Sequence, residues 1–163
     1  MVIVYGNPIK NWKCIFKECK ALCCHAAREA TGRDLKRISE GMGLKPEEFA
    51  DLDEKRGLFT LKGKDGRCIF VQDDFGCQLH AKGIKPILCQ MYPFRFDGLI
   101  YSDDILLKIK VREACLGLGT GKDLDEDFEI RIEELGNKFV KDIRDYLRLK
   151  AEGKSFDEIL KEL

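Results

Sequence analysis

The sequence lacks a charge excess of either sign and has no long hydrophobic run. Lysine plus arginine equal aspartate plus glutamate at 29 each in 163 residues, so no overall field favours nucleic acid or an anionic membrane. No stretch approaches the length of a transmembrane helix, and the first residues lack the basic and apolar segments of a secretory signal. We therefore expect a cytoplasmic protein that binds neither nucleic acid nor a membrane.

Histidine is also scarce, whereas cysteine is abundant. The two histidines lie close to cysteines, so no Ser-His-Asp constellation is indicated. Reduced cytosolic chains rarely need so many thiols at short spacings for packing alone, and thiolates are soft ligands for zinc, copper(I) and iron–sulfur clusters. The sequence therefore predicts a metalloprotein. The candidate ligands are Cys14, Cys19, Cys23, Cys24, Cys68, Cys77, His80, Cys89 and Cys115.

Several familiar ligand spacings are missing. The chain has neither the C-x2-C-x2-C-x3-C-P run of bacterial ferredoxins nor the C-x3-C-x2-C of radical enzymes that use S-adenosylmethionine. It also lacks the paired C-x2-C knuckles of an ordinary zinc ribbon. The number of thiols permits two four-thiolate sites, one Cys3His zinc site beside a cluster, or one cluster with thiols left over.

Some candidates have simpler interpretations beside the metal one. Cys68 alternates with strand residues, which is also typical of a small buried hydrophobic side chain. His80 follows Cys77 at ligand spacing, but a histidine that hydrogen-bonds a sulfur or a carbonyl fits equally well. His25 is interpreted as helix surface or as a support for the ligands. Tyr92 is interpreted as part of a packed turn that shields the site, with a hydroxyl able to reach a sulfur.

The N-terminal half is expected to mix short helices with a hairpin. Phe16, Cys19 and Cys23 recur at helical spacing, which predicts a helix over 12–30. A hairpin is expected over 57–72, turning at 63–66, with Cys68 on its return strand. The other expected elements are a strand over 1–5 and short helices over 34–42 and 46–52.

The C-terminal half is expected to hold the cysteines in turns and to end in helices. Residues 73–85 form a loop, Pro86 opens a short helix that carries Cys89, and Cys115 lies in a glycine-rich turn over 115–119. Strands are expected over 95–101 and 105–111. An apolar stripe predicts a long helix over 125–150, and Ser155 opens a final short helix with a capping box.

These elements predict an α+β fold, a single metal-organised domain. An N-terminal helix, a β-hairpin and irregular loops carry the cysteines in residues 1–117. Residues 118–163 form a C-terminal helical segment of the same domain, which packs over the cysteine-bearing half and closes the core.

The ordered set of cysteine motifs resembles the YkgJ-like cysteine-cluster family, which is described by a zinc- or iron-chelating domain. The resemblance covers about residues 14–117, with wider spacing of the first cysteines than the family's C-x2-C-x2-C-C form and Leu116 where a proline often follows the last cysteine. It is carried by Cys14, Cys19, Cys23-Cys24, Cys68-Ile69-Phe70, Cys77-Gln78-Leu79-His80, Lys85-Pro86-Ile87-Leu88-Cys89, Tyr92-Pro93-Phe94 and Cys115-Leu116-Gly117.

The resemblance implies a metal or iron–sulfur site formed by the cysteines. The family also looks related to the cluster-bearing part of bacterial flagellin lysine N-methylase. The leading hypothesis is therefore an iron–sulfur cluster of the four-iron type, or iron, serving electron transfer with a redox partner or a modification that uses S-adenosylmethionine. The second hypothesis is a structural zinc module that presents a surface to a protein partner. A third is metal storage or delivery, which requires exchangeable metal on exposed thiols.

Overall fold

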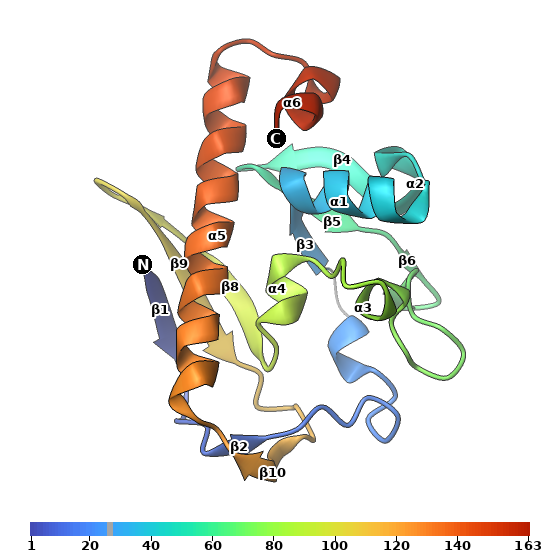
Figure 1. Cartoon of the computed structure of the whole chain (residues 1–163), viewed down its shortest axis with the longest axis vertical. Coiled ribbons are helices and arrows are strands. Elements are labelled where there is room, and N and C mark those ends of the chain that lie inside the picture. Colours follow the sequence, from blue (N-terminus) through green and yellow to red (C-terminus); the bar gives the residue numbers. More distant parts are fainter. Residues whose placement is uncertain (26–27) are drawn as a thin grey trace.

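The computed structural model describes residues 1–25 and 28–163 and confirms the α+β class. Two three-stranded sheets form its framework (Figure 1). In the first sheet, β9 (Ile105–Val111) lies between β1 (Val2–Tyr5), which is parallel to it, and β8 (Phe94–Tyr101), which is antiparallel. In the second, β5 (Leu58–Leu61) pairs antiparallel with both β3 (Arg28–Thr31) and β4 (Ala50–Lys55). The predicted strands at 1–5, 95–101 and 105–111 are thus confirmed.

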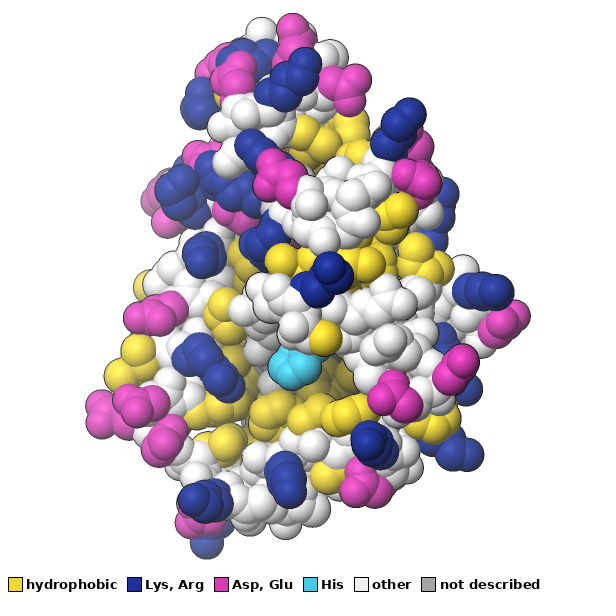
Figure 2. All heavy atoms as spheres, turned by 45° about the vertical axis from the view of Figure 1, so that its right-hand side comes forward, with side chains coloured by type: hydrophobic (Ala, Val, Ile, Leu, Met, Phe, Trp, Pro, Cys, Tyr) yellow, Lys and Arg dark blue, Asp and Glu magenta, His cyan; other side chains and the backbone are white. Residues whose placement is uncertain are grey.

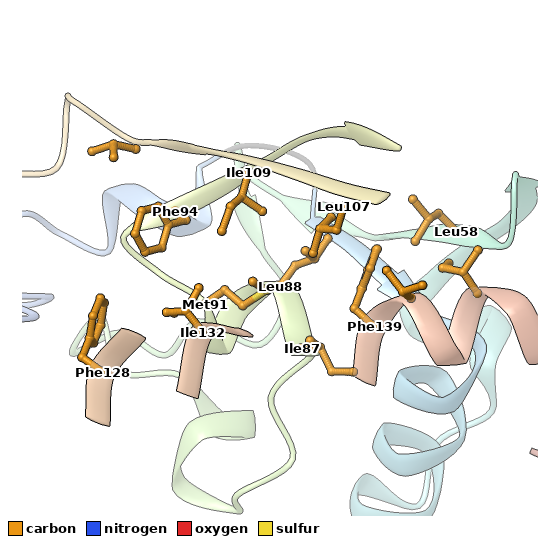
Figure 3. Close-up of a cluster of buried hydrophobic side chains, with 13 residues drawn as sticks. Leu58, Ile87, Leu88, Met91, Phe94, Leu107, Ile109, Phe128, Ile132 and Phe139 are labelled. Atoms are coloured by element: carbon orange, nitrogen blue, oxygen red, sulfur yellow. The ribbon is translucent and has the colours of Figure 1, made fainter. Parts of the chain in front are cut away.

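The long helix α5 (Glu126–Ala151) packs on the first sheet. Asp125 caps it by accepting a hydrogen bond from the N–H of Phe128 at 3.1 Å. Its apolar stripe, which includes Phe128, Ile132 and Phe139, faces Leu107 and Ile109 of β9 (Figure 3). The prediction of this helix is confirmed. So is the capping box of Ser155 and Glu158 that opens α6 (Phe156–Glu162).

A second core forms around β5. The helix α1 (Gly32–Met42) begins at Thr31, which caps it with Asp34, and α2 (Pro46–Phe49) follows. Phe49 and Phe59 are fully buried there. The expected helix over 34–42 is confirmed, whereas the one expected over 46–52 ends at Phe49 because the chain continues as β4. Tyr146 of α5 stacks edge-on against Phe59, so α5 contributes to both cores.

The helix expected over 12–30 is wrong. The described part of this segment contains the short strand β2 (Asn11–Trp12), turns, the one-turn 3₁₀ helix η1 (Leu22–Cys24) and then β3. Lys20 and Ala21 each have a φ of 52°, in the left-handed region that no α-helix passes through. The i, i+4 spacing of Cys19 and Cys23 therefore arises from turns. Residues 26 and 27 of the expected helix lie outside the described residues.

The expected hairpin is confirmed only at its tip. The strands β6 (Gly63–Lys64) and β7 (Arg67–Cys68) pair antiparallel, so Cys68 does lie on the return strand. Residues 58–61 pair instead with β3 and β4, as described above. The segment after Cys115 was expected to be a turn and then helical, but Leu118–Asp123 forms β10, which pairs with β2. Within the residues that the structure covers, no helix combines the length and apolar character needed to cross a membrane.

Candidate metal centre

The cysteines come from five different kinds of local structure. Cys23 and Cys24 lie on η1, Cys68 ends β7, and Cys77 immediately precedes the short helix α3 (Gln78–Ala81). Cys89 lies in α4 (Ile87–Gln90), as the sequence predicted. The remaining three lie outside helices and strands: Cys14 and Cys19 before η1, and Cys115 after β9. Figure 1 shows η1, α3 and α4 on the same side of the molecule, below the second sheet.

The helix α4 holds Cys89 in place through a buried carboxylate. The N–H of Ile87 donates to both oxygens of Asp34, at 3.2 and 3.3 Å. Arg37 donates to Asp34 and also to the carbonyl of Lys85, so α1 anchors the segment that leads into α4. Ile87 is 1% exposed and packs in the first core. The position of Cys89 is therefore fixed by two elements distant in sequence.

The structure brings the early and late cysteines together. Cys68 and Cys89 lie near enough to Cys24 to act on its pKa by charge repulsion, and Cys77 and Cys23 act in this way on the pKa of Cys68. Besides burial, Cys23 and Cys19 likewise raise the pKa of Cys14. Tyr92 interacts with Cys115, and burial, Cys115 and Cys23 all raise the pKa of its hydroxyl. The thiols thus form one neighbourhood, and all eight are free cysteines.

Cys23 and Cys24 form a hydrogen-bonded pair. Their Sγ atoms are 3.6 Å apart. This hydrogen bond lowers the pKa of Cys24, and, together with burial, it raises the pKa of Cys23. A hydrogen bond within the pair stabilises one thiolate beside one thiol, which prepares the pair to bind a cation.

Burial favours the neutral form of three other thiols. It raises the pKa of Cys14, of Cys68 and of Cys89, the last to about 12. The positive charges of Arg28 and Lys85 act in the opposite direction on Cys89. A metal cation would supply the remaining positive charge that several thiolates need. Soft sulfur donors in partly buried surroundings fit zinc or iron by the chemistry of the donor set.

The arrangement is wider than a site for one ion. Among residues 1–25 and 28–163, no three histidine, cysteine, aspartate or glutamate side chains are gathered closely enough to hold a metal ion. His80 is exposed in α3, and His25 is exposed after η1. Figure 2 shows one histidine beside a recess whose floor has the colour of hydrophobic side chains, a class that includes cysteine.

Two basic residues of this neighbourhood were not predicted from the sequence. Arg28 and Lys85 each act on several thiols, although neither is acidic, sulfur-containing or at ligand spacing. Lys85 belongs to the Lys85–Cys89 motif, so the sequence could have indicated it. No sequence pattern indicates Arg28, because its approach to Cys68 and Cys89 depends on the pairing of β3 with β5 and on the packing of β3 against α4.

A family model matches residues 13–116, most of the chain: CxxCxxCC, described as a "putative zinc- or iron-chelating domain". The chain belongs to this family. The match confirms the resemblance seen in the sequence and supports the binding of zinc or iron. No curated protein matches the chain, and no solved structure does. The family segment ends just after Cys115, so β10, α5 and α6 lie beyond it.

Proposed function

We propose that the cysteines hold one iron–sulfur cluster, of the four-iron type. The observation that carries the proposal is that Cys23 and Cys24, from the first half of the family segment, lie near Cys68 and Cys89, from its second half. With Cys14 and Cys77 nearby, the neighbourhood holds more thiols than the four that one zinc ion takes. The surplus supports a polynuclear centre.

The spacing of the sulfurs distinguishes one zinc ion from a cluster. One tetrahedral zinc ion with Zn–S bonds of about 2.3 Å needs sulfurs roughly 3.8 Å apart. The Cys23–Cys24 pair meets this requirement at 3.6 Å, but no third ligand among the described residues joins it closely enough for one ion. In a four-iron cluster each thiolate binds a different iron, so the sulfurs lie farther apart.

The second candidate is a structural zinc site. The separation of Cys23 and Cys24 favours it, because adjacent ligands of one zinc ion lie at that distance. Such a site would hold η1 against β7 and α4 and present the surrounding surface to a protein partner.

For the cluster, we propose a role in electron transfer or in a modification that uses S-adenosylmethionine, in the cytoplasm and with a redox partner. When bound, the cluster would supply one-electron chemistry. The chain's own contribution is to hold it with thiolates and to cover it with apolar side chains. Met91, directly after α4, is fully buried in the first core.

The test is anaerobic purification followed by analysis of iron, zinc and acid-labile sulfide. We expect iron and sulfide in nearly equal amounts and broad absorption in the visible range. Stoichiometric zinc without sulfide would contradict the cluster and establish the zinc alternative.

A further inference from the structure

Arg28 lies on the inward face of β3. Side chains alternate along a strand, so Arg28 and Ala30 share one face, and Ala30 is 0% exposed in the second core. Glu29, between them, lines an open groove on the other face, together with Asp51 and Phe96. The register of β3 on β5, with Arg28 opposite Leu61, fixes this orientation.

The Arg28 guanidinium has a buried nitrogen without a partner. Its Nη2 is buried and makes no hydrogen bond to any residue in the described part of the chain. Two other partly buried arginines differ in this respect, because Arg33 pairs with Asp142 and Arg37 with Asp34. A buried hydrogen-bond donor on a charged group destabilises the fold when it has no partner. The fold therefore provides a place for an anion beside Arg28.

The elements around Arg28 carry thiols. The strand β3 packs against α4, which carries Cys89, and η1, with Cys23 and Cys24, lies just before β3 in the chain. Cys68 is also near enough for the charge of Arg28 to act on it. No carboxylate forms an ion pair with Arg28 among the residues described. The missing anion is thus best supplied by the thiolates themselves, once a metal binds them.

We propose that Arg28 is a charge-balancing residue of the metal centre, which donates hydrogen bonds from its guanidinium to the metal-bound sulfur. The inference rests on the proposed binding of metal by the cysteines, but not on which metal is bound. Four thiolates carry a net charge of 2− on either a zinc(II) ion or an oxidised four-iron cluster. One guanidinium within hydrogen-bond distance halves that charge and stabilises it by charge-assisted hydrogen bonds.

The test compares Arg28→Gln and Arg28→Lys with the wild-type, metal-loaded protein. Glu29→Gln is the matched control, because it alters the same strand on the face that lines the groove. The chelator concentration that removes half of the bound metal is measured for each protein. We expect Arg28→Gln to release metal at an about 10- to 100-fold lower chelator concentration. Arg28→Lys, which keeps the charge, should retain most of the wild-type resistance, and Glu29→Gln all of it.

A second readout separates charge balance from a structural role. If the metal is an iron–sulfur cluster, reduction adds a negative charge, so Arg28→Gln should lower the reduction potential; a tenfold effect on the one-electron equilibrium is 59 mV. For zinc, the melting temperature of metal-free Arg28→Gln should not fall below that of the metal-free wild type, although its metal affinity falls.

The outcomes distinguish failure of metal binding by the cysteines from failure of the role proposed for Arg28. Wild-type protein that binds no metal would overturn the proposed function and this inference with it. Wild-type protein that binds metal, beside Arg28→Gln with the same chelator resistance, would overturn the inference alone. An equal loss in Arg28→Gln, Arg28→Lys and Glu29→Gln would also overturn it, because the effect would then be one of strand packing.

Discussion

At the scale of single residues, the centre depends on side chains that are not ligands. Asp34 is fully buried and accepts hydrogen bonds from the N–H groups of Thr31 and Ile87. It also pairs with Arg37. These contacts connect the start of α1 with the start of α4. A substitution at Asp34 should therefore alter the position of Cys89, because Asp34 holds the backbone of α4.

Asp34 should make stability depend on pH. Burial raises its pKa to about 6; Arg37 opposes this rise, and the neighbouring Asp142 adds to it, while Cys89 of α4 also senses the Asp34 charge. The folded protein binds this proton more tightly than the unfolded chain does. Ionised Asp34 therefore lowers the free energy of unfolding by its full amount above about pH 6, and this loss disappears as the pH falls toward 4.

The prediction compares wild type with Asp34→Asn, which cannot ionise. The free energy of unfolding of the wild type, minus that of the variant, should rise by up to about 3 kcal/mol between pH 7 and pH 4. Denaturant titrations across that range measure it. A difference that stays constant with pH would contradict the raised pKa.

At the scale of elements, the contact between α5 and the first sheet depends on a glycine. Gly136 is buried in the middle of α5, and a Cβ atom there would overlap Cγ2 of Val2 on β1 and approach Leu107 of β9 at 3.5 Å. A solvent-exposed helical glycine gains up to about 1 kcal/mol on change to alanine. Here the overlap opposes that gain.

Gly136→Ala should therefore destabilise the protein by about 1–3 kcal/mol, as overpacking of a close contact does. Adding Val2→Ala removes the overlapping methyl groups and should recover part of the loss in a double-mutant cycle. Denaturant unfolding of the wild type, the two single variants and the double variant measures the loss and its recovery. Stabilisation by Gly136→Ala alone would show that α5 does not pack closely on β1.

Elements differ in how well their sequence predicts them. The helix α5 could be predicted because its apolar stripe continues for six turns, and α4 because Pro86 marks its start. The segment before β3 could not, since the helical spacing of Cys19 and Cys23 conceals two residues with positive φ. The strand β10 was missed because, among the described strands, it pairs just with the two-residue β2, and its glycines indicate a turn.

The same limit applies to the candidate centre. Its cysteines could be named from the sequence because thiols at such spacings are rare outside metal sites. That these cysteines lie together could not be predicted from the sequence, because Cys24 approaches Cys68 and Cys89 only after β3, β5 and α4 have packed together. Whether His80 contributes stays a prediction.

At the scale of the whole molecule, metal binding and stability should be linked. The cysteine-bearing segments are mostly turns and single-turn helices, which have little regular structure of their own. At a metal concentration 100 times the Kd, binding adds about 2.7 kcal/mol to stability. Chelation should then lower the melting temperature by roughly 5–10 °C for a chain of this size.

The control for this prediction is the chelator applied to Cys89→Ser, which we expect to lack metal already. Its melting temperature should not respond to chelator. An unchanged melting temperature in the stripped wild-type protein would indicate that the cysteines serve packing alone.

The central claim is that cysteines from both halves of the family segment serve one centre. The most direct test is the metal-to-protein ratio of Cys24→Ser and Cys89→Ser, each measured beside wild type after the same anaerobic loading. A serine hydroxyl stays protonated near neutral pH and replaces neither thiolate. One shared centre predicts that each single change removes nearly all of the metal. Two variants that each keep about half of it would contradict the claim, because they would place Cys24 and Cys89 in separate centres.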